Sequence, residues 1–312
     1  GEERAAVLGA GSWGTALALL LAGSAGEVRL WDRTGAQVDA LRADRENRRY
    51  LPGHPLPPSV SPEADLAAAL SGAACVVLAV PSSALAGVVA AAAPFLAPGV
   101  DLILASKGID PQTLEVPSQV AARALGDASG ARHARVALSG PNLAREVAAG
   151  VPTAAVAASS DPEAARRVAH RFNRPSFRTY VGADILGVEI GGAVKNVLAI
   201  AGGVSDGLGY GDNTKAALMT RGLAEMARLG VAMGAQRETF YGLAGVGDLM
   251  ATAASRLSRN WRVGDGLARG KDLETVLREL GQVAEGVPTA RAVAALSSRH
   301  GIALPVCAAV DD

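Results

Sequence analysis

Cysteine is scarce in this chain, which has only Cys75 and Cys307 among its 312 residues, each in an apolar stretch. Two isolated thiols of this kind are typical of buried cysteines in a reducing compartment and do not make the disulfide framework of a small secreted domain. The first residues also lack the charged, long apolar and cleavage segments of a signal peptide. We therefore expect a cytoplasmic protein.

An excess of charge and clustered histidines are also missing. Thirty basic side chains balance thirty acidic ones, so no overall field favours nucleic acid or an anionic membrane surface, and we expect neither as a partner. The four histidines, His54, His133, His170 and His300, stand far apart without the spacing of metal ligands. The sequence therefore predicts no metal site.

Residues 66–100 carry no charge at all, and by composition alone they could suggest a membrane span. Pro81, Pro94 and Pro98 divide this stretch, however, and much of it is alanine. Because proline interrupts helices, the pattern predicts buried helices around one strand and no membrane insertion.

The composition that is present is typical of a globular protein, with 49% apolar and 19% charged residues. At the usual size of about 100–200 residues per domain, the length predicts two domains. Short apolar runs alternate with helical patterns up to about residue 180, which predicts an α/β Rossmann-like domain with a doubly wound parallel sheet. The candidate strands are residues 5–8, 28–31, 75–79, 101–105, 135–138, 154–157 and 177–181.

After Gly182 the pattern changes to long helical segments at residues 188–204, 215–233 and 271–280. This change predicts an all-α C-terminal domain. We place the division between residues 1–183, a dinucleotide-binding domain, and residues 184–312, a helical domain for substrate binding and catalysis.

A glycine motif, Gly9-Ala10-Gly11-Ser12-Trp13-Gly14, directly follows the first candidate strand and opens a helix at residues 15–21. In such a motif Gly9 permits the tight turn, Gly11 lets the backbone approach a pyrophosphate, and Gly14 lets helix and strand pack closely. The helix N-terminus then faces the phosphates. The alternative is a strand–helix turn that is merely rich in glycine.

Asp32 and Arg33 stand at the end of the second candidate strand. A carboxylate there would hold a ribose 2′-hydroxyl, whereas a guanidinium would accept a 2′-phosphate. Asp32 could instead cap the helix that follows. The pair therefore leaves the cofactor open between NAD and NADP.

Lysine is rare as well, since Lys107, Lys195, Lys215 and Lys271 are the only four. Lys107 follows a strand at the carboxyl edge of the predicted sheet, where open α/β folds bind ligands. Lys195 lies in a predicted helix after paired glycines, and a buried ammonium there would have a depressed pKa and could act as an acid or base. A structural salt bridge is the alternative for each lysine.

Together these residues resemble the bacterial NAD(P)-dependent sn-glycerol-3-phosphate dehydrogenases, from residue 5 to nearly the end. The matching stretches are residues 9–14, 79–82, 106–108, 138–141, the Lys195-Asn196 helix, 211–215, 245–249 and 258–260. The resemblance implies reversible reduction of dihydroxyacetone phosphate to sn-glycerol 3-phosphate with NADH or NADPH, which supplies glycerol phosphate for phospholipid synthesis. It also implies a C-terminal domain like that of 6-phosphogluconate dehydrogenase and, by analogy, a homodimer.

Carried over by residue, the resemblance makes Lys195 the general acid and base. It places Lys107, Gly140, Asn142, Lys195, Asp248, Ser258, Arg259 and Asn260 around the substrate. Besides Gly9, Gly11 and Gly14, the dinucleotide would contact Ser12, Trp13, Arg33, Lys107, Ala144, Arg259, Val283 and Glu285. These residue types suit the reaction, because an alkoxide needs a proton donor and a phosphate dianion needs a guanidinium and amide donors.

Some residues depart from the family or have a second interpretation. Asn142 stands where the family usually has Ser or Thr, and the chain ends at Asp312, which predicts a shortened terminal helix. Asp248 could hold a lysine or a substrate hydroxyl, or it could cap the helix at residues 249–254. Arg45, Arg48 and Arg49 beside Tyr50 resemble the family's loop over the cofactor, and a solvated loop is the alternative. Residues 242–247 are interpreted as a helix-entry turn near the substrate.

Two other functions are compatible with parts of the pattern. Enzymes of the 6-phosphogluconate or 3-hydroxyacid dehydrogenase type share the two-domain plan, but they usually have asparagine four residues after the helix lysine, where this chain has Ala199. A dinucleotide-sensing module that catalyses nothing is the second alternative, and the candidate acid and phosphate-binding residues argue against it.

Overall fold

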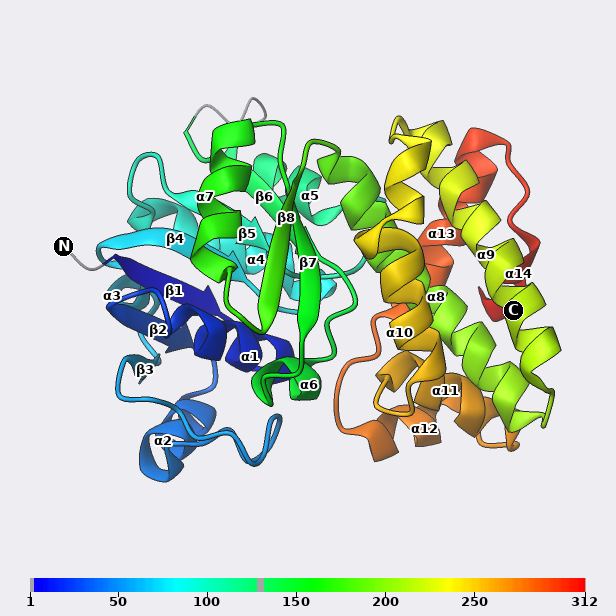
Figure 1. Cartoon of the computed structure of the whole chain (residues 1–312), viewed down its shortest axis with the longest axis horizontal. Coiled ribbons are helices and arrows are strands. Elements are labelled where there is room, and N and C mark those ends of the chain that lie inside the picture. Colours follow the sequence, from blue (N-terminus) through cyan, green and yellow to red (C-terminus); the bar gives the residue numbers. More distant parts are fainter. Residues whose placement is uncertain (1–2, 128–131, 312) are drawn as a thin grey trace.

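The computed structural model describes residues 3–127 and 132–311, and it divides them between a half built on a β-sheet and a half built of helices (Figure 1). The sheet half contains β1 (Arg4–Leu8), α1 (Ser12–Leu21), β2 (Glu27–Trp31), α2 (Gly35–Asp44), β3 (Val60–Glu63), α3 (Leu66–Leu70), β4 (Ala73–Leu78), α4 (Ser82–Ala92), η1 (Ala93–Phe95), β5 (Asp101–Leu104), α5 (Pro117–Leu125), β6 (Arg135–Ser139), α6 (Ala144–Ala148), β7 (Thr153–Ala158), α7 (Pro162–Phe172) and β8 (Phe177–Gly182). The predicted α/β class is confirmed.

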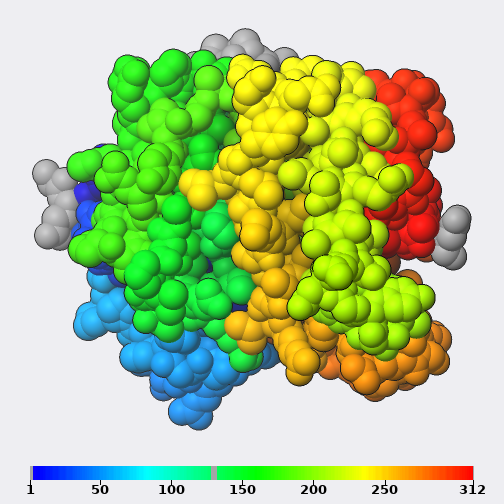
Figure 2. All heavy atoms as spheres, turned by 45° about the vertical axis from the view of Figure 1, so that its right-hand side comes forward, coloured from blue at the N-terminus to red at the C-terminus, as the bar shows by residue number. Residues whose placement is uncertain are grey.

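The helical half follows β8 without a further strand in the described part of the chain. It contains α8 (Ile185–Gly207), α9 (Asp212–Met233), η2 (Arg237–Tyr241), η3 (Leu243–Gly247), α10 (Asp248–Ala254), α11 (Arg259–Ala268), α12 (Leu273–Leu280), α13 (Gly286–His300) and α14 (Pro305–Asp311). Figure 2 shows the two halves side by side, with green residues of the sheet half directly against yellow and orange residues of the helical half.

The sheet has eight strands in the order β3-β2-β1-β4-β5-β6-β7-β8. Chain order reverses direction at β1 and β4, which is the arrangement of a doubly wound fold. The pairs from β3 through to β6 are parallel, β7 is antiparallel to β6, and β8 is parallel to β7. The sheet is therefore mostly parallel, and the strand pattern did not show that the last two strands run in the opposite direction.

All seven candidate strands are present, and β3 is the strand that the sequence did not reveal. It is an edge strand of four residues, paired only with β2, and it contains Pro62. Proline cannot donate a hydrogen bond to a second neighbour, so within sheets it is tolerated mainly at edges. A short run interrupted by proline does not have the apolar pattern of a strand.

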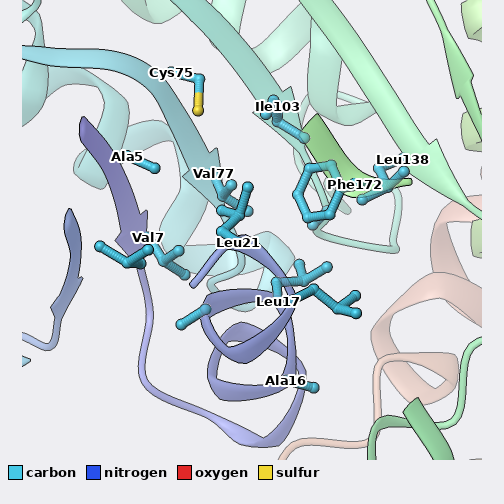
Figure 3. Packing of buried hydrophobic residues seen from close by; sticks show 14 of the residues in the cluster. Ala5, Val7, Ala16, Leu17, Leu21, Cys75, Val77, Ile103, Leu138 and Phe172 are labelled. Carbon is cyan, nitrogen blue, oxygen red and sulfur yellow. The ribbon is translucent and has the colours of Figure 1, made fainter. Parts of the chain in front are cut away.

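Each face of the sheet is covered by its own apolar cluster. Figure 3 shows one of them, in which Val7, Val77 and Ile103 of the strands face Leu17 of α1 and Phe172 of α7. The residues of opposite parity, such as Leu8 and Leu78, pack against α3, α4 and α5 on the other face. This alternation follows from the two-residue period of a strand and explains why the central strands are apolar throughout.

The uncharged stretch at residues 66–100 is part of this sheet half, where it forms α3, β4, α4 and η1. Cys75 in β4 and Cys307 in α14 are both buried free thiols, as predicted. Among the described residues, one helix, α8, is long and apolar enough to cross a membrane, but 83% of its apolar window is buried inside the fold. It is the central helix of the helical half, and α9, α10, α11 and α13 pack around it.

The packing of α11 on α8 brings two backbones together. A methyl group on Gly203 of α8 would lie 2.0 Å from the carbonyl oxygen of Trp261, and one on Gly264 of α11 would lie 2.0 Å from the carbonyl oxygen of Ile200. Both distances are far inside van der Waals contact, so only glycine fits at these two positions. This contact fixes the start of α11 beside α8.

Candidate active site

The candidate site lies where the carboxyl ends of β1, β4, β5 and β6 meet the helical half (Figure 1). In open α/β sheets ligands bind beyond these ends, near the point where strand order reverses. The loops after these strands carry the glycine motif, Lys107 and Gly140, and the facing helices α8, α10 and α11 carry Lys195, Asp248 and Arg259. The sequence-predicted residues thus come from both halves to one boundary.

At the centre of the site, one carboxylate holds two ammonium groups. The Lys195 Nζ donates to Asp248 Oδ1 at 2.5 Å, and the Lys107 Nζ donates to Asp248 Oδ2 at 3.0 Å. Lys107 also donates to the carbonyl oxygen of Gly140 at 3.3 Å. Asp248 is the first residue of α10, yet its side chain faces the lysines, so the interpretation that it holds a lysine is the one that the geometry supports.

Burial and charge together set the protonation of this cluster. Burial lowers the pKa of Lys195 from its usual 10.5 to about 8, although the Asp248 carboxylate raises it, and the ammonium of Lys107 lowers it further. Burial alone would raise the pKa of Asp248, but Lys107 and Lys195 hold it below its usual value. Asp248 is therefore ionised at neutral pH, and Lys195 can gain or lose a proton within the physiological range.

Thr252 is a member of the cluster that the sequence analysis missed. Its Oγ1 accepts a hydrogen bond from the Lys195 Nζ at 2.9 Å and donates one to Asp248 Oδ1 at 3.1 Å. The signal in the sequence is spacing, because residues four apart on a helix lie on the same face. With Thr252 and Asp248 as its neighbours, the ammonium of Lys195 has a fixed direction.

Asn196 and Asn260 extend the polar network toward the first turn of α11. The Asn196 side chain donates to the carbonyl oxygen of Lys107 at 3.3 Å and accepts from the Asn260 side chain at 2.9 Å. Asn260 in turn accepts the backbone N–H of Gly286 at 2.9 Å. The side chain of Asn260 is thus held in place by two protein partners, and its predicted substrate contact stays a prediction.

The start of α11 offers donors for an anion. Ser258 caps the helix by accepting the backbone N–H of Trp261 at 3.2 Å. The backbone N–H groups of Arg259 and Asn260 open the helix, where the helix dipole favours negative charge. Within the described ranges, the Arg259 guanidinium makes no hydrogen bond or close ion pair, and burial lowers its pKa while Glu285 acts in the opposite direction.

Glu285 lies at the start of α13 and contacts the sheet half. Its two carboxylate oxygens accept the backbone N–H of Ser82 at 3.0 Å and the Ser82 hydroxyl at 2.5 Å. Burial raises the pKa of Glu285, while Ser82 and Arg259 oppose that rise. Val283 is 46% exposed on the loop before it. Ser82 is a further contact in the site that only its position in the matched stretch at residues 79–82 could have indicated.

The glycine motif has the geometry expected of a dinucleotide turn. Gly9 has φ +110°, and a methyl group on Gly14 would lie 1.8 Å from the carbonyl oxygen of Gly9. A methyl group on Gly11 would meet no atom within 4 Å, so this stretch of backbone is open to a ligand. A side chain at Gly9 would be strained, and one at Gly14 would clash with the turn. The turn therefore requires glycine at both positions, as a dinucleotide-binding turn does.

Two buried polar atoms of the predicted site residues suit a bound ligand. The indole N–H of Trp13 and the Oδ1 of Asn142 are buried and have no partner in the described part of the chain. Asn142 donates through its Nδ2 to the carbonyl oxygen of Ala154 at 3.0 Å, so its free oxygen is held in a fixed direction just before α6, which begins at Ala144. Buried polar groups without partners are rare and commonly mark a ligand site.

At the end of β2 the two candidate specificity residues have different surroundings. Asp32 accepts the backbone N–H groups of Ala10 at 3.3 Å and Thr34 at 2.9 Å, so it links β2 to the glycine turn and to the start of α2. Arg33 is exposed and forms no hydrogen bond or salt bridge with the residues that the structure describes. The nearby Asn47 side chain donates to the carbonyl oxygen of Ala10 at 2.9 Å, so the segment that contains Arg48 and Arg49 is attached to the turn at Asn47.

Two further predicted features can be located in the structure. Residues 243–247 form η3, a π-helical turn that leads into α10, as the interpretation of a helix-entry turn requires. Among the described residues, no group of three His, Cys, Asp or Glu side chains could hold a metal ion. Two lysines, a carboxylate, a free guanidinium and an open glycine turn thus lie at one boundary, a combination that can bind an anionic substrate beside a dinucleotide and exchange a proton with it.

Comparisons with known proteins agree over nearly the whole chain. Sequence models of the NAD-dependent glycerol-3-phosphate dehydrogenase N-terminus and C-terminus match residues 4–165 and 184–312. A glycerol-3-phosphate dehydrogenase [NAD(P)+] of Geobacter sulfurreducens is 52% identical over 98% of this chain and 90% of its own.

Solved structures give the same result. The crystal structure of glycerol-3-phosphate dehydrogenase from Coxiella burnetii has a TM-score of 0.94 at 40% identity and covers 99% of this chain and 93% of that one. The corresponding enzyme from Saccharomyces cerevisiae has a TM-score of 0.83 at 28% identity and covers 100% of this chain and 95% of its own.

Proposed function

The chain belongs to the NAD-dependent glycerol-3-phosphate dehydrogenase family, and on that premise we propose how its own residues carry out the reaction. It is an NAD(P)-dependent oxidoreductase that reversibly reduces dihydroxyacetone phosphate to sn-glycerol 3-phosphate. The product is the glycerol phosphate that phospholipid synthesis requires.

Lys195 is the general acid for reduction and the general base for oxidation. When bound, the reduced dinucleotide supplies a hydride to the substrate carbonyl, whose oxygen then carries negative charge. The Lys195 ammonium donates a proton to this oxygen, and its pKa of about 8 allows it to take a proton back in the reverse direction. The observation that carries this role is the cluster of Lys195, Asp248 and Lys107 at the boundary between the two halves.

Asp248 and Lys107 support that proton transfer in different ways. Asp248 holds the ammonium of Lys195 in place, and its negative charge stabilises the charged form of the lysine. Lys107 keeps Asp248 ionised and brings a second positive charge to the place where the alkoxide develops. Thr252 completes the orientation of Lys195, and Gly140 does the same for Lys107.

Arg259 binds the substrate phosphate together with the first turn of α11. A planar guanidinium without a hydrogen-bond partner among the described residues can hold two phosphate oxygens at once. Ser258 and the backbone N–H groups of Arg259 and Asn260 add donors at the helix start. The Asn260 side chain, held in place by Asn196 and Gly286, is a further contact for the substrate beside these donors.

The dinucleotide is held mainly by the sheet half. Gly9, Gly11, Ser12, Trp13 and Gly14 form the turn around its phosphates, and Arg33 accepts a 2′-phosphate when NADPH is bound. From around the substrate site, Lys107, Ala144, Val283, Glu285 and Arg259 complete the contacts. The open backbone at Gly11 and the unpartnered indole N–H of Trp13 support this assignment, and the unpartnered Asn142 oxygen supports a substrate contact.

The domain division, location and assembly are part of the same proposal. Residues 1–183 serve as the dinucleotide-binding domain and residues 184–312 as the catalytic and substrate-binding domain, since β8 ends at Gly182 and α8 begins at Ile185. The buried free thiols Cys75 and Cys307 support a cytoplasmic location. A homodimer is proposed from the family, and light scattering of the purified chain would test it.

A steady-state assay tests the reaction on this chain. Oxidation of NADH and NADPH is followed with dihydroxyacetone phosphate and, in parallel, formation of both reduced cofactors is followed with sn-glycerol 3-phosphate and with 6-phosphogluconate. We expect turnover with the first two substrates and none with 6-phosphogluconate. Cofactor binding without any turnover would instead support a dinucleotide sensor.

A further inference from the structure

Glu189 is a buried carboxylate for which the proposed reaction has no role. It lies in α8, is 6% exposed, and takes part in no salt bridge in the described part of the chain. Its oxygens accept the backbone N–H of Ser118 at 2.7 Å and the Ser118 hydroxyl at 2.5 Å. Burial raises the pKa of Glu189 to about 8, and the bonds from Ser118 oppose that rise. Burying a carboxylate without an ion pair costs free energy, and hydrogen bonds such as those from Ser118 offset part of that cost.

The contact joins the two halves of the molecule. Ser118 is the second residue of α5, whose Val120 and Ala121 pack under the sheet, whereas Glu189 belongs to the central helix of the helical half. The N–H groups in the first turn of a helix have no partner within the helix. Glu189 supplies that partner for Ser118 from across the boundary.

The contact also bears on the catalytic lysine. Lys195 follows Glu189 by six residues on the same continuous helix, which is about 9 Å along its axis. Lys107, on the sheet half, reaches Asp248 on the helical half at 3.0 Å. The charged cluster therefore depends on the position of α8 along the sheet half. Glu189 links α8 to that half through Ser118, and Asn196 links it through the carbonyl oxygen of Lys107.

A second contact of the same form lies elsewhere on the boundary. Glu285 accepts the backbone N–H and hydroxyl of Ser82, which is the first residue of α4, just as Glu189 accepts those of Ser118. In both cases a glutamate of the helical half binds a serine in the first turn of a helix of the sheet half. Glu285 is also a proposed dinucleotide contact, whereas Glu189 is buried, is hydrogen-bonded to Ser118, and is also influenced by the positive charge of Arg135.

We propose that Glu189 is a positioning residue, which fixes α8 against α5 through Ser118 and thereby places Lys195 relative to Lys107. The proposal rests on the role proposed for Lys195. The two can fail separately. An active Lys195→Met enzyme would contradict the role of Lys195, whereas wild-type kcat in Glu189→Ala would contradict the role of Glu189 whatever Lys195→Met does.

The test compares Glu189→Ala, Glu189→Gln and Ser118→Ala with the wild type, at a temperature below every melting transition. A displacement of about 1 Å in an active site can reduce turnover about a hundredfold. We expect kcat for dihydroxyacetone phosphate to fall at least about tenfold in Glu189→Ala and less in Ser118→Ala, which keeps the backbone N–H. The Kd for NADH should stay within about twofold of wild type, because the glycine turn is untouched. Glu189→Gln should restore most of kcat, since an amide can accept the N–H of Ser118 and donate to its hydroxyl.

Glu225→Ala is the matched control. Glu225 of α9 is also a buried carboxylate that binds the start of another helix. It accepts the N–H groups of Val306 at 2.8 Å and Cys307 at 3.0 Å in α14, but both partners belong to the helical half. Its loss should lower the melting temperature without reducing kcat. A folded Glu189→Ala enzyme with wild-type kcat would overturn the proposal, as would an equal loss of kcat in Glu225→Ala. If Glu189→Ala does not fold, wild-type kcat in Ser118→Ala would overturn the proposal instead.

Discussion

The ammonium of Lys195 lies 2.5 Å from one oxygen of Asp248, and the other oxygen of the same carboxylate holds Lys107 from the opposite half of the molecule. Three charged groups that are far apart in the sequence thus share one buried site with a net charge of +1. A developing alkoxide would neutralise that charge, so the cluster is suited to the transition state of carbonyl reduction.

Replacing Lys195 by methionine should abolish hydride transfer while the fold and the bound dinucleotide remain. Methionine has a similar length but cannot donate a proton, and loss of proton transfer alone reduces the rate about 10²–10⁴-fold. Asp248 would keep Lys107 as its partner, so the variant does not leave an unpaired buried charge. Stopped-flow transfer, NADH fluorescence titration and a circular dichroism melt on one preparation would measure this. Retention of more than about a tenth of wild-type turnover would contradict the assignment.

The pH dependence should differ in sign between the two directions. Burial lowers the pKa of Lys195 to about 8, so the ammonium needed for reduction is lost as pH rises through that value, and kcat/KM for reduction should fall there. Oxidation needs the neutral amine, and its kcat/KM should rise through the same range. In Asp248→Asn the carboxylate that raises the pKa is gone, so both transitions should move to lower pH. Profiles between about pH 5 and pH 10 would test this, and an unchanged transition in Asp248→Asn would contradict the coupling.

Arg259→Lys should fail to restore binding of the substrate phosphate. Lysine keeps the charge but loses the planar group that contacts two oxygens, and a charge-assisted hydrogen bond contributes about 1.5–3 kcal/mol. The KM for dihydroxyacetone phosphate should therefore rise about tenfold or more in Arg259→Lys and further in Arg259→Ala. Arg262→Ala, on an exposed position of the same helix, serves as the control. A normal KM in Arg259→Lys would remove the two-oxygen contact from the mechanism.

Arg33→Ala should weaken the binding of NADPH more than the binding of NADH. Arg33 is exposed without a protein partner among the described residues, whereas Asp32 is bound to Ala10 and Thr34. A free guanidinium gains most from the 2′-phosphate that only NADPH carries, and its loss should raise the KM for NADPH about tenfold. Michaelis constants for both cofactors, measured in parallel, decide the matter. Equal losses would mean that Arg33 does not bind the 2′-phosphate.

Sequence reasoning was most reliable where one local pattern determines the structure. The apolar runs of the central strands and the glycine spacing at residues 9–14 predicted the fold and its turn, because periodicity and steric requirements are local properties. The edge strand β3 was missed because Pro62 interrupts a short run, and the reversal of β7 was missed because strand direction depends on chain connections rather than on composition.

In the candidate site, the sequence indicated which residues take part more readily than which of them contact one another. Lys195, Lys107 and Asp248 were all identified, but their shared contact depends on how two halves meet, which no local pattern specifies. For the same reason Thr252 was missed, and the contacts of Asn260 with Asn196 and Gly286 were not foreseen.

The backbone contact between α8 and α11 limits how this enzyme can vary during evolution. Alanine at Gly203 or Gly264 would force the two helices apart, and α11 carries the proposed phosphate-binding turn while α8 carries Lys195. Such a change would lengthen the span between the proposed phosphate anchor and the proposed proton donor. Two glycines outside the charged cluster thus constrain the length of substrate that the proposed site can accept.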